Sequence, residues 1–324
     1  MEPLVSICCI TYNHEKYIAD AIESFLMQEV DFPYEIIVHD DASMDNTQKI
    51  IKEYESRYPE LIKTILQTEN QYSKGFQLQR IFAEYASGKY LAICEGDDYW
   101  TDPHKLQKQI DFLEANVDCI ATAHNVRVID ECGLLVDDKK HCYKAYPSHT
   151  FTLRDAEYFG LPGQMASLVF RNIWPSINID MKELYFSCSG NGDQKLAILL
   201  TLHGDIFCFA DIMADHRKVI SGGTSWSAEN HGKNMVLYNF RTFLDMKKFA
   251  AIAFGVKLDD NEIRLRVVYS AWRKFLFSPN KENRQILKDV LQMNNYDNNR
   301  FMLFVFKKII TWPVRRYKRW MLNS

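Results

Sequence analysis

The sequence has no apolar run long enough to cross a membrane and no strong excess of one charge. No stretch approaches the roughly 18 to 20 consecutive apolar residues that a membrane helix needs. The formal net charge is -3, which argues against a general nucleic-acid binder. Residues 1–4 lead directly into a strand-like segment and do not resemble a secretory signal peptide. We therefore expect a cytoplasmic protein.

The sequence also lacks a C-x-x-C pair, although it contains eight cysteines. Several of these cysteines lie inside apolar segments that are typical of strands. Buried free thiols are therefore the expected state, in preference to disulfides or metal ligands. Such thiols fit a reducing compartment.

A glycine-rich turn is missing after the first predicted strand. Dinucleotide-binding oxidoreductases carry G-x-G-x-x-G at that place, whereas residues 11–16 read TYNHEK. This excludes the oxidoreductase class, even though the chain begins with the same β-α-β pattern.

What the first third of the chain does contain is a regular alternation of strand and helix patterns. A β-α-β-α-β-α-β order predicts a parallel sheet with right-handed crossovers. The expected strands cover residues 4–11, 34–38, 61–66 and 89–94, and the expected helices cover 17–27, a segment after 45, and 76–85.

The remainder of the chain is expected to complete the sheet and then become helical. A boundary near residue 225 divides an α/β domain, 1–225, from a helical C-terminal region, 226–324. The expected elements are helices 105–116 and 193–202, strands 119–129, 166–170 and 206–209, and helices 235–254, 261–277 and 281–293.

Polar residues follow three of the four predicted parallel strands. They are residues 11–13, residues 40–45 and residues 95–98, and the last two groups contain paired acids. Ligands of open α/β sheets bind beyond the carboxyl ends of the strands. Crowded carboxylates repel one another unless a cation compensates them, and Mg²⁺ or Mn²⁺ prefers such oxygen ligands. The sequence therefore predicts a divalent-metal site at this edge of the sheet.

Each acid at a strand end could instead cap the helix that follows it. We favour capping for Asp45, leave both roles open for Asp40, and disfavour capping for Asp97 and Asp98. The last two precede large aromatic residues, which suggest the wall of a ligand site, although Trp100 could also belong to the core.

The ordered motifs at 5–13, 38–45 and 95–100 resemble those of family 2 glycosyltransferases. That family has the GT-A fold, a Rossmann-like, mostly parallel sheet flanked by helices, and uses nucleotide sugars. The resemblance covers roughly residues 3–226. The variant at 96–109, GDDYWTDPHKLQKQ, is similar to that of bacterial enzymes that build O-antigen, capsule or other surface polysaccharides. It implies an inverting transferase with Mn²⁺ or Mg²⁺ as cofactor and a saccharide or lipid-linked saccharide as acceptor.

The resemblance assigns the first two strand ends to the nucleotide. Asp41 matches the residue that binds the base, usually uracil. Tyr12 and Asn13 match residues of the nucleotide pocket, and Thr11 belongs to the same segment.

The resemblance assigns the third strand end to the metal and the donor. Asp98 matches the main metal ligand, and Asp97 the contact to ribose or donor sugar. The segment 74–77, KGFQ, departs from the family, whose members often carry Asn there, so donor contacts from that loop are in doubt.

An inverting transfer needs one carboxylate near the acceptor as general base. Asp193, in the segment GNGDQKL at 190–196, precedes an apolar helix and matches the family's base. It could instead only cap that helix. Residues 161–167 are expected to border the acceptor site, by the resemblance alone.

Two further residues are expected at the diphosphate. Arg217 suits a bidentate contact to phosphate, and His216 could reach the metal or the phosphate, although a lone His is more often structural. A segment at 221–225, SGGTS, follows them and matches a stretch that closes over the diphosphate in relatives.

The C-terminal segment 300–319 is rich in Lys, Arg and aromatic residues, and no acid follows Asp297. It suits peripheral contact with an anionic membrane on the inner face of the cell membrane. The alternative is a helix that packs on the catalytic domain. For the protein as a whole, the alternative is a non-catalytic nucleotide-sugar-binding or scaffolding protein, which the complete set of Asp41, Asp97, Asp98 and Asp193 disfavours.

Overall fold

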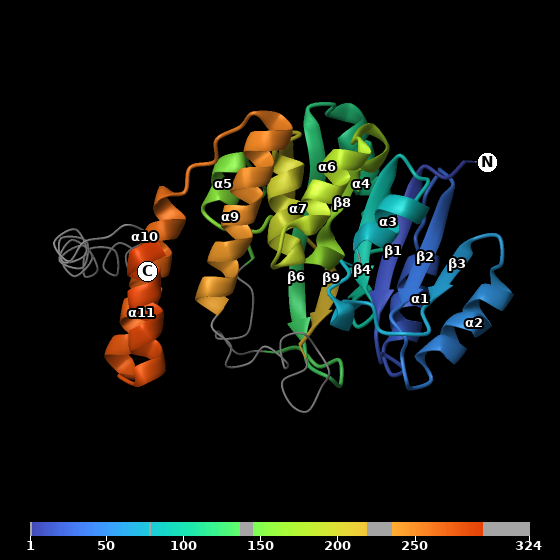
Figure 1. The fold of residues 1–324 in the computed structure, drawn as a ribbon. Helices are drawn as coiled ribbons and strands as arrows, with labels where there is room; N and C mark the ends of the chain where they lie inside the picture. The colour runs from blue at the N-terminus through green and yellow to red at the C-terminus, as the bar shows by residue number, and fades with distance from the viewer. Residues whose placement is uncertain (1, 78, 137–144, 219–234, 294–324) are drawn as a thin grey trace, which may run out of the picture. The chain divides into compact units, whose positions relative to one another are not determined.

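The computed structural model describes residues 2–77, 79–136, 145–218 and 235–293. Its centre is a nine-stranded sheet in the order β3-β2-β1-β4-β8-β6-β9-β5, with β7 paired to β9 (Figure 1). The strands are β1 (Val5–Thr11), β2 (Tyr34–Asp40), β3 (Ile62–Leu66), β4 (Tyr90–Glu95), β5 (Tyr99–Trp100), β6 (Cys119–Ile129), β7 (His149–Phe151), β8 (Val169–Arg171) and β9 (Asp205–Arg217).

The first four long strands form the parallel half of the sheet, as the sequence predicts. β1 lies between β2 and β4, and β2 also pairs with β3, all in parallel. In the register, Thr11 stands opposite Asp40 and Ile10 opposite Glu95. The three polar strand ends are therefore neighbours at one edge of the sheet.

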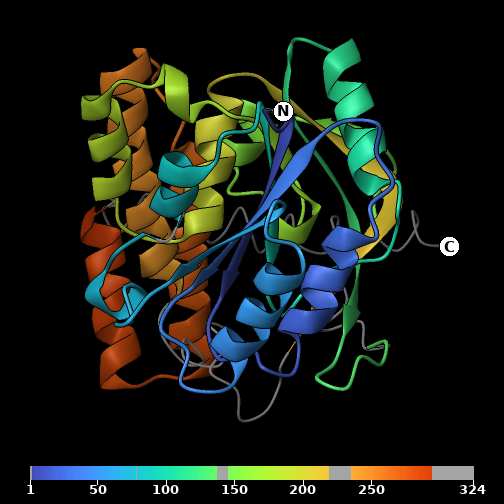
Figure 2. The same ribbon diagram turned by 90° about the vertical axis from the view of Figure 1, so that its right-hand side faces the viewer.

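Helices cover both faces of this half (Figure 2). α1 (Ile18–Leu26) and α2 (Thr47–Arg57) connect strands that advance in one direction across the sheet, and α3 (Gln79–Tyr85) connects β3 back to β4. Right-handed crossovers place α1 and α2 on one face and α3 on the other. Strands covered on both sides must be apolar throughout, and β1, with Ile7, Cys8 and Cys9 fully buried, meets that demand.

The second half of the sheet is mixed. β8 is antiparallel to both β4 and β6, whereas β6 runs parallel to β9. The two-residue strand β5 returns antiparallel to the far end of β9. α4 (Lys105–Ala115) precedes β6, and α7 (Gly192–Thr201) precedes β9.

Several elements differ from the sequence-based expectation. The strand expected at 206–209 is much longer and continues to Arg217. The strand expected at 166–170 is a 3₁₀ turn, η2 (Met165–Ser167), followed by β8. The short strands β5 and β7 and the helices α5 (Leu153–Glu157) and α6 (Ile179–Ser187) were not expected.

By its contacts the chain divides into two units, Met1–Lys233 with Thr242–Lys257, and Asn234–Arg241 with Leu258–Ser324. The helices expected near the C-terminus are present as α9 (Met235–Phe254), α10 (Asn261–Phe277) and α11 (Lys281–Met293). Within the described ranges, no helix is both long and apolar enough to cross a membrane. The predicted basic segment 300–319 and the segment 221–225 lie outside the described residues.

The cysteines of the described segments are free thiols, and five of them are buried, namely Cys8, Cys9, Cys94, Cys188 and Cys208. Burial raises the pKa of the Cys9 thiol, and nearby acids, first among them Asp97, raise it further. This agrees with the expected role of these side chains as small core residues.

Candidate active site

Two pairings assemble the candidate site. The parallel register brings the ends of β1, β2 and β4 together, as described above. The antiparallel pairing of β5 with β9 then places Tyr99 opposite Asp215. Because β5 directly follows the Asp97-Asp98 pair and β9 ends in His216-Arg217, the two dipeptides become neighbours.

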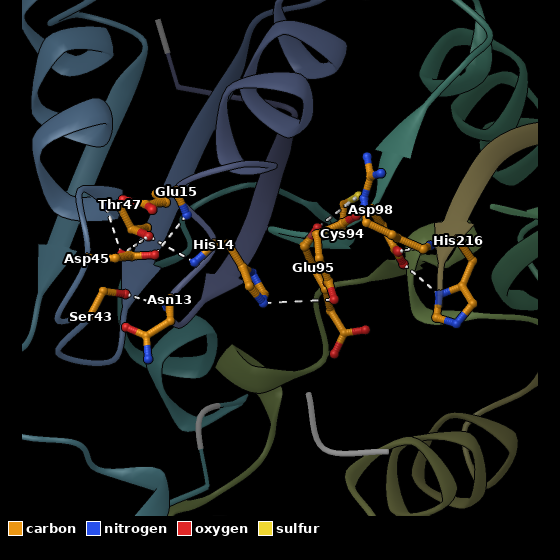
Figure 3. Close-up of polar contacts among 12 residues, drawn as sticks. Asn13, His14, Glu15, Ser43, Asp45, Thr47, Cys94, Glu95, Asp98 and His216 are labelled. Carbon is orange, nitrogen blue, oxygen red and sulfur yellow. Dashed lines mark hydrogen bonds and ion pairs between the residues drawn. The ribbon is translucent and has the colours of Figure 1, made fainter. Parts of the chain in front are cut away.

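The carboxylate of Asp98 is the centre of this arrangement (Figure 3). It is 1% exposed and accepts two hydrogen bonds, from His216 Nδ1 at 3.0 Å and from the backbone N–H of Arg217 at 2.8 Å. Both donors come from the end of β9. Asp98 therefore fixes the orientation of the His216 ring, whose Nε2 carries the lone pair when the ring is neutral.

Asp97 faces the opposite side, toward the end of β1. Its Oδ2 lies 3.8 Å from His14 Nε2, and both side chains are 18% exposed. Burial raises the pKa of Asp97, the positive charge of a protonated His14 opposes this shift, and repulsion from Asp98 adds to it. Asp97 is the partly accessible member of the pair and Asp98 the enclosed one.

Glu95, the last residue of β4, adds a third carboxylate. Although its side chain reaches the surface, the protein around it limits its hydration, and this loss of hydration, followed by repulsion from Asp97, Asp193 and Asp98, raises its pKa well above the usual range. The charge of Asp193, which belongs to another part of the chain, is thus felt at the acidic strand end. The expected convergence of Asp193 with Asp97 and Asp98 stays a prediction.

His216 partly compensates the negative charge. Burial alone would favour the neutral ring, but the charges of Asp98, Glu95 and Asp97 and the hydrogen bond to Asp98 raise the pKa of His216 to about 9. The site thus stabilises a positive charge among its carboxylates, which is the electrostatic setting in which a divalent cation binds.

Asp193 lies in the first turn of α7. The cap of this helix is Asn191, whose side chain accepts a hydrogen bond from the Asp193 backbone N–H at 2.9 Å. The capping role that the sequence left open for Asp193 therefore belongs to Asn191, and the Asp193 carboxylate is not needed for it. Burial raises the pKa of Asp193, and the nearby His216 opposes the shift.

A shallow pocket adjoins Asp193. Its walls come from the segment 161–165, from Leu168, and from Ala197 and Leu200 of α7. Residues 161–165 of the segment expected to border the acceptor site line this pocket, and the acceptor site itself stays a prediction. Most of the lining is apolar, so a carboxylate at its edge is poorly hydrated, which is the physical cause of the raised pKa.

The loop that leads to Asp193 is held by α9. Gly190 has a φ of 105°, and a Cβ there would lie 1.7 Å from Thr242 Oγ1. The same Oγ1 accepts the Asn191 backbone N–H at 3.2 Å, and Asp245 accepts from the Ser189 hydroxyl at 2.6 Å. A glycine is therefore required at 190, and α9 fixes the approach to α7.

Buried polar contacts hold α7 from the other side. Lys195 is 1% exposed, and its ammonium donates to Gln77 Oε1 and to the backbone oxygen of Cys188, the latter at 2.8 Å. Gln77 in turn donates to the same Cys188 oxygen at 2.9 Å. The segment 74–77, which departs from the family pattern, thus contacts the loop before Asp193.

The residues expected at the nucleotide lie along the first two strand ends. The Asp41 carboxylate is 1% exposed and accepts the backbone N–H groups of Gln71 at 2.7 Å and Tyr72 at 3.1 Å. Asn13 has a φ of 55° and accepts the Met44 N–H at 2.8 Å. These bonds join the loops after β1, β2 and β3 into one surface.

Two residues of the same segment differ in access. Thr11 is 1% exposed, and Gly96 packs so closely on its side chain that a Cβ at 96 would lie 2.7 Å away. Tyr12 is half-buried. Contact between the nucleotide and Thr11, Tyr12, Asn13 or Asp41 remains a prediction.

Asp40 and Asp45 are structural. Asp40 accepts hydrogen bonds from Ser43 N–H at 2.9 Å and Gln48 Nε2 at 2.6 Å. Asp45 accepts from the Thr47 N–H at 3.0 Å, but the cap position of α2 is Asn46, so Asp45 supports the start of the helix without being its predicted cap. The sequence left the role of Asp40 open, and these hydrogen bonds to Ser43 and Gln48 show that it holds its own turn and the start of α2.

Arg217 is 5% exposed and occupied by protein partners. Its Nε donates to the Asp97 backbone oxygen at 3.0 Å, and its guanidinium lies 4.3 Å from the centroid of the Tyr17 ring. It also forms an ion pair with Asp20 at 3.5 Å. In this arrangement Arg217 fastens β9 to the acidic strand end, and its contact with a diphosphate remains a prediction.

The donor atoms at the site fit a hard divalent cation chemically. The Asp98 carboxylate is bonded to one imidazole, that of His216, and each carboxylate oxygen has two lone pairs, so Asp98 retains acceptor capacity beyond its two bonds. In the described part of the chain, no group of three or more His, Cys, Asp or Glu side chains is arranged to hold a metal by itself.

Sequence reasoning did not assign roles to Glu95, His14 or Thr242. The first two could have been predicted, because ligands of open α/β sheets bind beyond the carboxyl ends of the strands. Glu95 ends β4, and His14 stands just beyond β1. No sequence signal connects Thr242 to the site, because its contact with Gly190 depends on tertiary packing.

The comparisons with known proteins agree with this fold. The profile of glycosyl transferase family 2 matches residues 6–170, half of the chain, and the chain belongs to that family. The crystal structure of Staphylococcus aureus TarS 1-349 with UDP-GlcNAc superimposes with a TM-score of 0.56 at 17% identity, and the match covers 91% of this chain and 80% of that TarS fragment. This likeness shows the GT-A fold.

Sequence relatives are similar over a shorter segment. Rv1520 of Mycobacterium tuberculosis, an uncharacterised protein, is 47% identical over 132 residues, 40% of this chain and 37% of its own length. The putative teichuronic acid biosynthesis glycosyltransferase TuaG of Bacillus subtilis is 37% identical over 113 residues, 35% and 42% of the two chains. The putative glycosyltransferase EpsE of the same organism is 35% identical over 132 residues, 41% and 46%. The chain thus spans less than half of these relatives.

Proposed function

We propose that this protein is an inverting glycosyltransferase that moves a sugar from a nucleoside diphosphate sugar, with UDP-sugars as the first candidates, to a saccharide or lipid-linked saccharide in surface polysaccharide synthesis. The observation that carries the proposal is the acidic strand end, where Asp98 is hydrogen-bonded to His216 of β9 and the charge of Asp193 in α7 influences the pKa of Glu95. The name of TuaG supports the acceptor class, and the UDP-GlcNAc bound by TarS supports the donor class.

Asp193 acts as the general base in this mechanism. It takes the proton of the acceptor hydroxyl as the oxygen attacks the anomeric carbon and the nucleoside diphosphate leaves on the opposite face, so the configuration inverts. A base works best when its pKa is near the working pH, and the raised pKa of Asp193 goes in that direction. The pocket beside Asp193 receives the acceptor.

The donor lies along the other strand ends. Asp41, with Thr11, Tyr12 and Asn13, surrounds the nucleotide, and Asp97 contacts the ribose or the donor sugar. Asp98 and the deprotonated imidazole of His216 would hold Mn²⁺ or Mg²⁺, with Asp98 also orienting the imidazole, as carboxylates do for metal-binding histidines. Such a cation would supply positive charge to the leaving diphosphate. Arg217 fixes the strand that carries His216, and its contact with phosphate is implied by the family resemblance alone.

A donor screen tests the proposal. The full chain is incubated with a panel of UDP-, GDP-, CMP- and dTDP-sugars and Mn²⁺ or Mg²⁺, and release of the nucleotide is measured, followed by NMR of the product's anomeric configuration. We expect release from at least one donor and an inverted product. A protein that neither cleaves any donor nor binds one in a metal-dependent way would be a non-catalytic member of the fold, and a retained configuration would remove Asp193 as base.

A further inference from the structure

Helix α4 places two polar residues against strand β6, away from the candidate active site. Gln109 donates through Nε2 to Thr122 Oγ1 at 3.1 Å and to the Ser167 backbone oxygen at 3.0 Å. One helical turn before Gln109 is Lys105, and two residues after Thr122 is His124. One helical turn rises about 5.4 Å and two strand residues about 6.6 Å, so Lys105 lies beside His124.

All three side chains are buried: Lys105 and Gln109 are fully buried and His124 is 2% exposed. Each presents one atom that has no hydrogen-bond partner in the protein, namely Lys105 Nζ, Gln109 Oε1 and His124 Nε2. A buried polar atom without a partner costs about 1–3 kcal/mol. Gln109 bonds to Thr122 and the charge of Lys105 is felt at His124, so the three atoms face the same interface between α4 and β6, which indicates that one ligand satisfies them together.

The neighbouring carbonyl groups fix which of these atoms donate. His124 Nδ1 lies 2.8 Å from the Asn125 backbone oxygen, so Nδ1 carries the hydrogen and Nε2 is an acceptor. Burial, and then the charge of Lys105, lower the pKa of His124 to about 3, which keeps the ring neutral. Gln109 Nε2 faces the Ser167 carbonyl, so its Oε1 is also an acceptor. Lys105 Nζ is the donor.

We propose that Lys105, Gln109 and His124 together bind one internal water molecule. The water accepts a hydrogen bond from Lys105 Nζ and donates its two hydrogens to Gln109 Oε1 and His124 Nε2. One donor and two acceptors match the bonding capacity of water. The two acceptors disfavour an anion, and the lysine disfavours a cation.

The site also supports the acidic strand end. Lys105 Nζ lies 4.1 Å from the centroid of the Trp100 ring, and Trp100 Nε1 donates to the Ala166 backbone oxygen at 2.9 Å. Phe25 packs edge-on against the same ring at 4.9 Å. Trp100 belongs to β5, directly after Asp97 and Asp98. The bound water holds Lys105 against Trp100 from behind the sheet.

A crystal structure of the full chain at near-atomic resolution tests the inference without reference to activity. We expect a single ordered water within hydrogen-bonding distance of Lys105 Nζ, Gln109 Oε1 and His124 Nε2. A dry contact, with Nζ bonded directly to Gln109 Oε1 or to His124, would overturn the proposal, as would an ion in place of water.

Magnetic relaxation dispersion in solution provides a second measurement, because it counts long-lived internal waters. Lys105→Met removes the donor while it keeps an unbranched side chain, and we expect the count to fall by one. Lys108→Met, on the exposed side of the same helix, is the matched control and should leave the count unchanged. Equal counts in the wild type and Lys105→Met would contradict the proposal, and the wild-type crystal structure decides the matter if the variant does not fold.

Discussion

A hydrogen bond of 3.0 Å joins the imidazole of His216 to the carboxylate of Asp98, although the two residues lie near the ends of different strands. Asp98 follows β4, and His216 is next to last in β9. The bond makes Asp98 an orienting group for His216 as much as a ligand in its own right.

Asp98→Asn should lower the affinity for Mn²⁺ by about 10- to 100-fold, the usual effect of losing a carboxylate that orients a metal-binding histidine. Asn retains an acceptor for the Arg217 N–H but presents its NH₂ group to His216, which then turns its protonated nitrogen toward the metal. Calorimetric titration with Mn²⁺ in the presence of UDP measures the effect. Asp211→Asn, an exposed position on β9, is the control. Wild-type affinity in Asp98→Asn would assign the metal to Asp97 and Glu95.

Asp193→Asn should lower the rate of transfer by about 10²- to 10⁴-fold, the usual contribution of a general base, while donor binding persists. The Asn191 cap remains, so α7 should still form. Transfer rate and UDP binding are measured on the same preparation. Asp180→Asn, an exposed acid in the first turn of α6, is the matched control. Turnover that survives in Asp193→Asn would exclude Asp193 as the base.

The pH dependence of transfer follows from the same residue. A general base must be deprotonated, and burial raises the pKa of Asp193 above that of an ordinary aspartate. Activity should therefore be complete above this raised pKa and decline as the pH falls through it, at a higher pH than an exposed aspartate would give. The profile of kcat against pH at saturating donor measures it. An acidic limb at the position of an unperturbed carboxyl group would argue against a buried base.

Gly190→Ala should destabilise the protein by at least about 2 kcal/mol, because left-handed backbone strain and overpacking each cost about 1–2 kcal/mol or more. A Cβ at 190 would collide with Thr242 Oγ1. Gly255→Ala is the matched control, since Gly255 also has a positive φ of 66° but no atom within 4 Å of the added Cβ. Urea unfolding compares the two variants. Equal losses would show that the Thr242 contact does not constrain the loop before Asp193.

Lys105→Met should change how the free energy of unfolding depends on pH. Burial lowers the pKa of Lys105 to about 7, while the unfolded lysine titrates near 10.4. Between these values the unfolded chain binds more protons, so wild-type stability rises with pH by up to about 1.4 kcal/mol per unit and falls as the pH approaches 7. The variant lacks this pH-dependent contribution to the free energy of unfolding. Urea unfolding at pH 7, 8 and 9 measures how the difference in stability between wild type and variant changes with pH, and Lys108→Met is the control. A constant difference would mean that Lys105 keeps its ordinary pKa.

The parallel half of the fold could be predicted because its strands are buried on both faces. Such strands are continuous apolar segments, as in β1, and their order in the chain dictates parallel pairing. α6 shows where this reasoning ends. Its buried side chains, Tyr185 and Phe186, are adjacent and not spaced by three or four residues, so no helical period is visible.

The site could be predicted only in part. Asp41, Asp97 and Asp98 could be predicted because they stand just after the carboxyl ends of parallel strands. Asp193 could be predicted from the family resemblance. The contact of Asp98 with His216 depends on β5, which at two residues is too short to leave a pattern, and on the polar end of β9, which reads as a loop. The enclosure of Arg217 by Tyr17 and Asp20 likewise depends on packing between distant segments.

The pairing of Tyr99 with Asp215 has a consequence for synthesis of the chain. The acidic strand end leaves the ribosome long before its partner, and until β9 follows, Asp97 and Asp98 have neither the Arg217 amide nor the His216 ring beside them. A long sequence separation delays such a contact during folding. In the nascent chain β5 therefore stays unpaired until β9 has been synthesised. The candidate site forms among the last features of its unit.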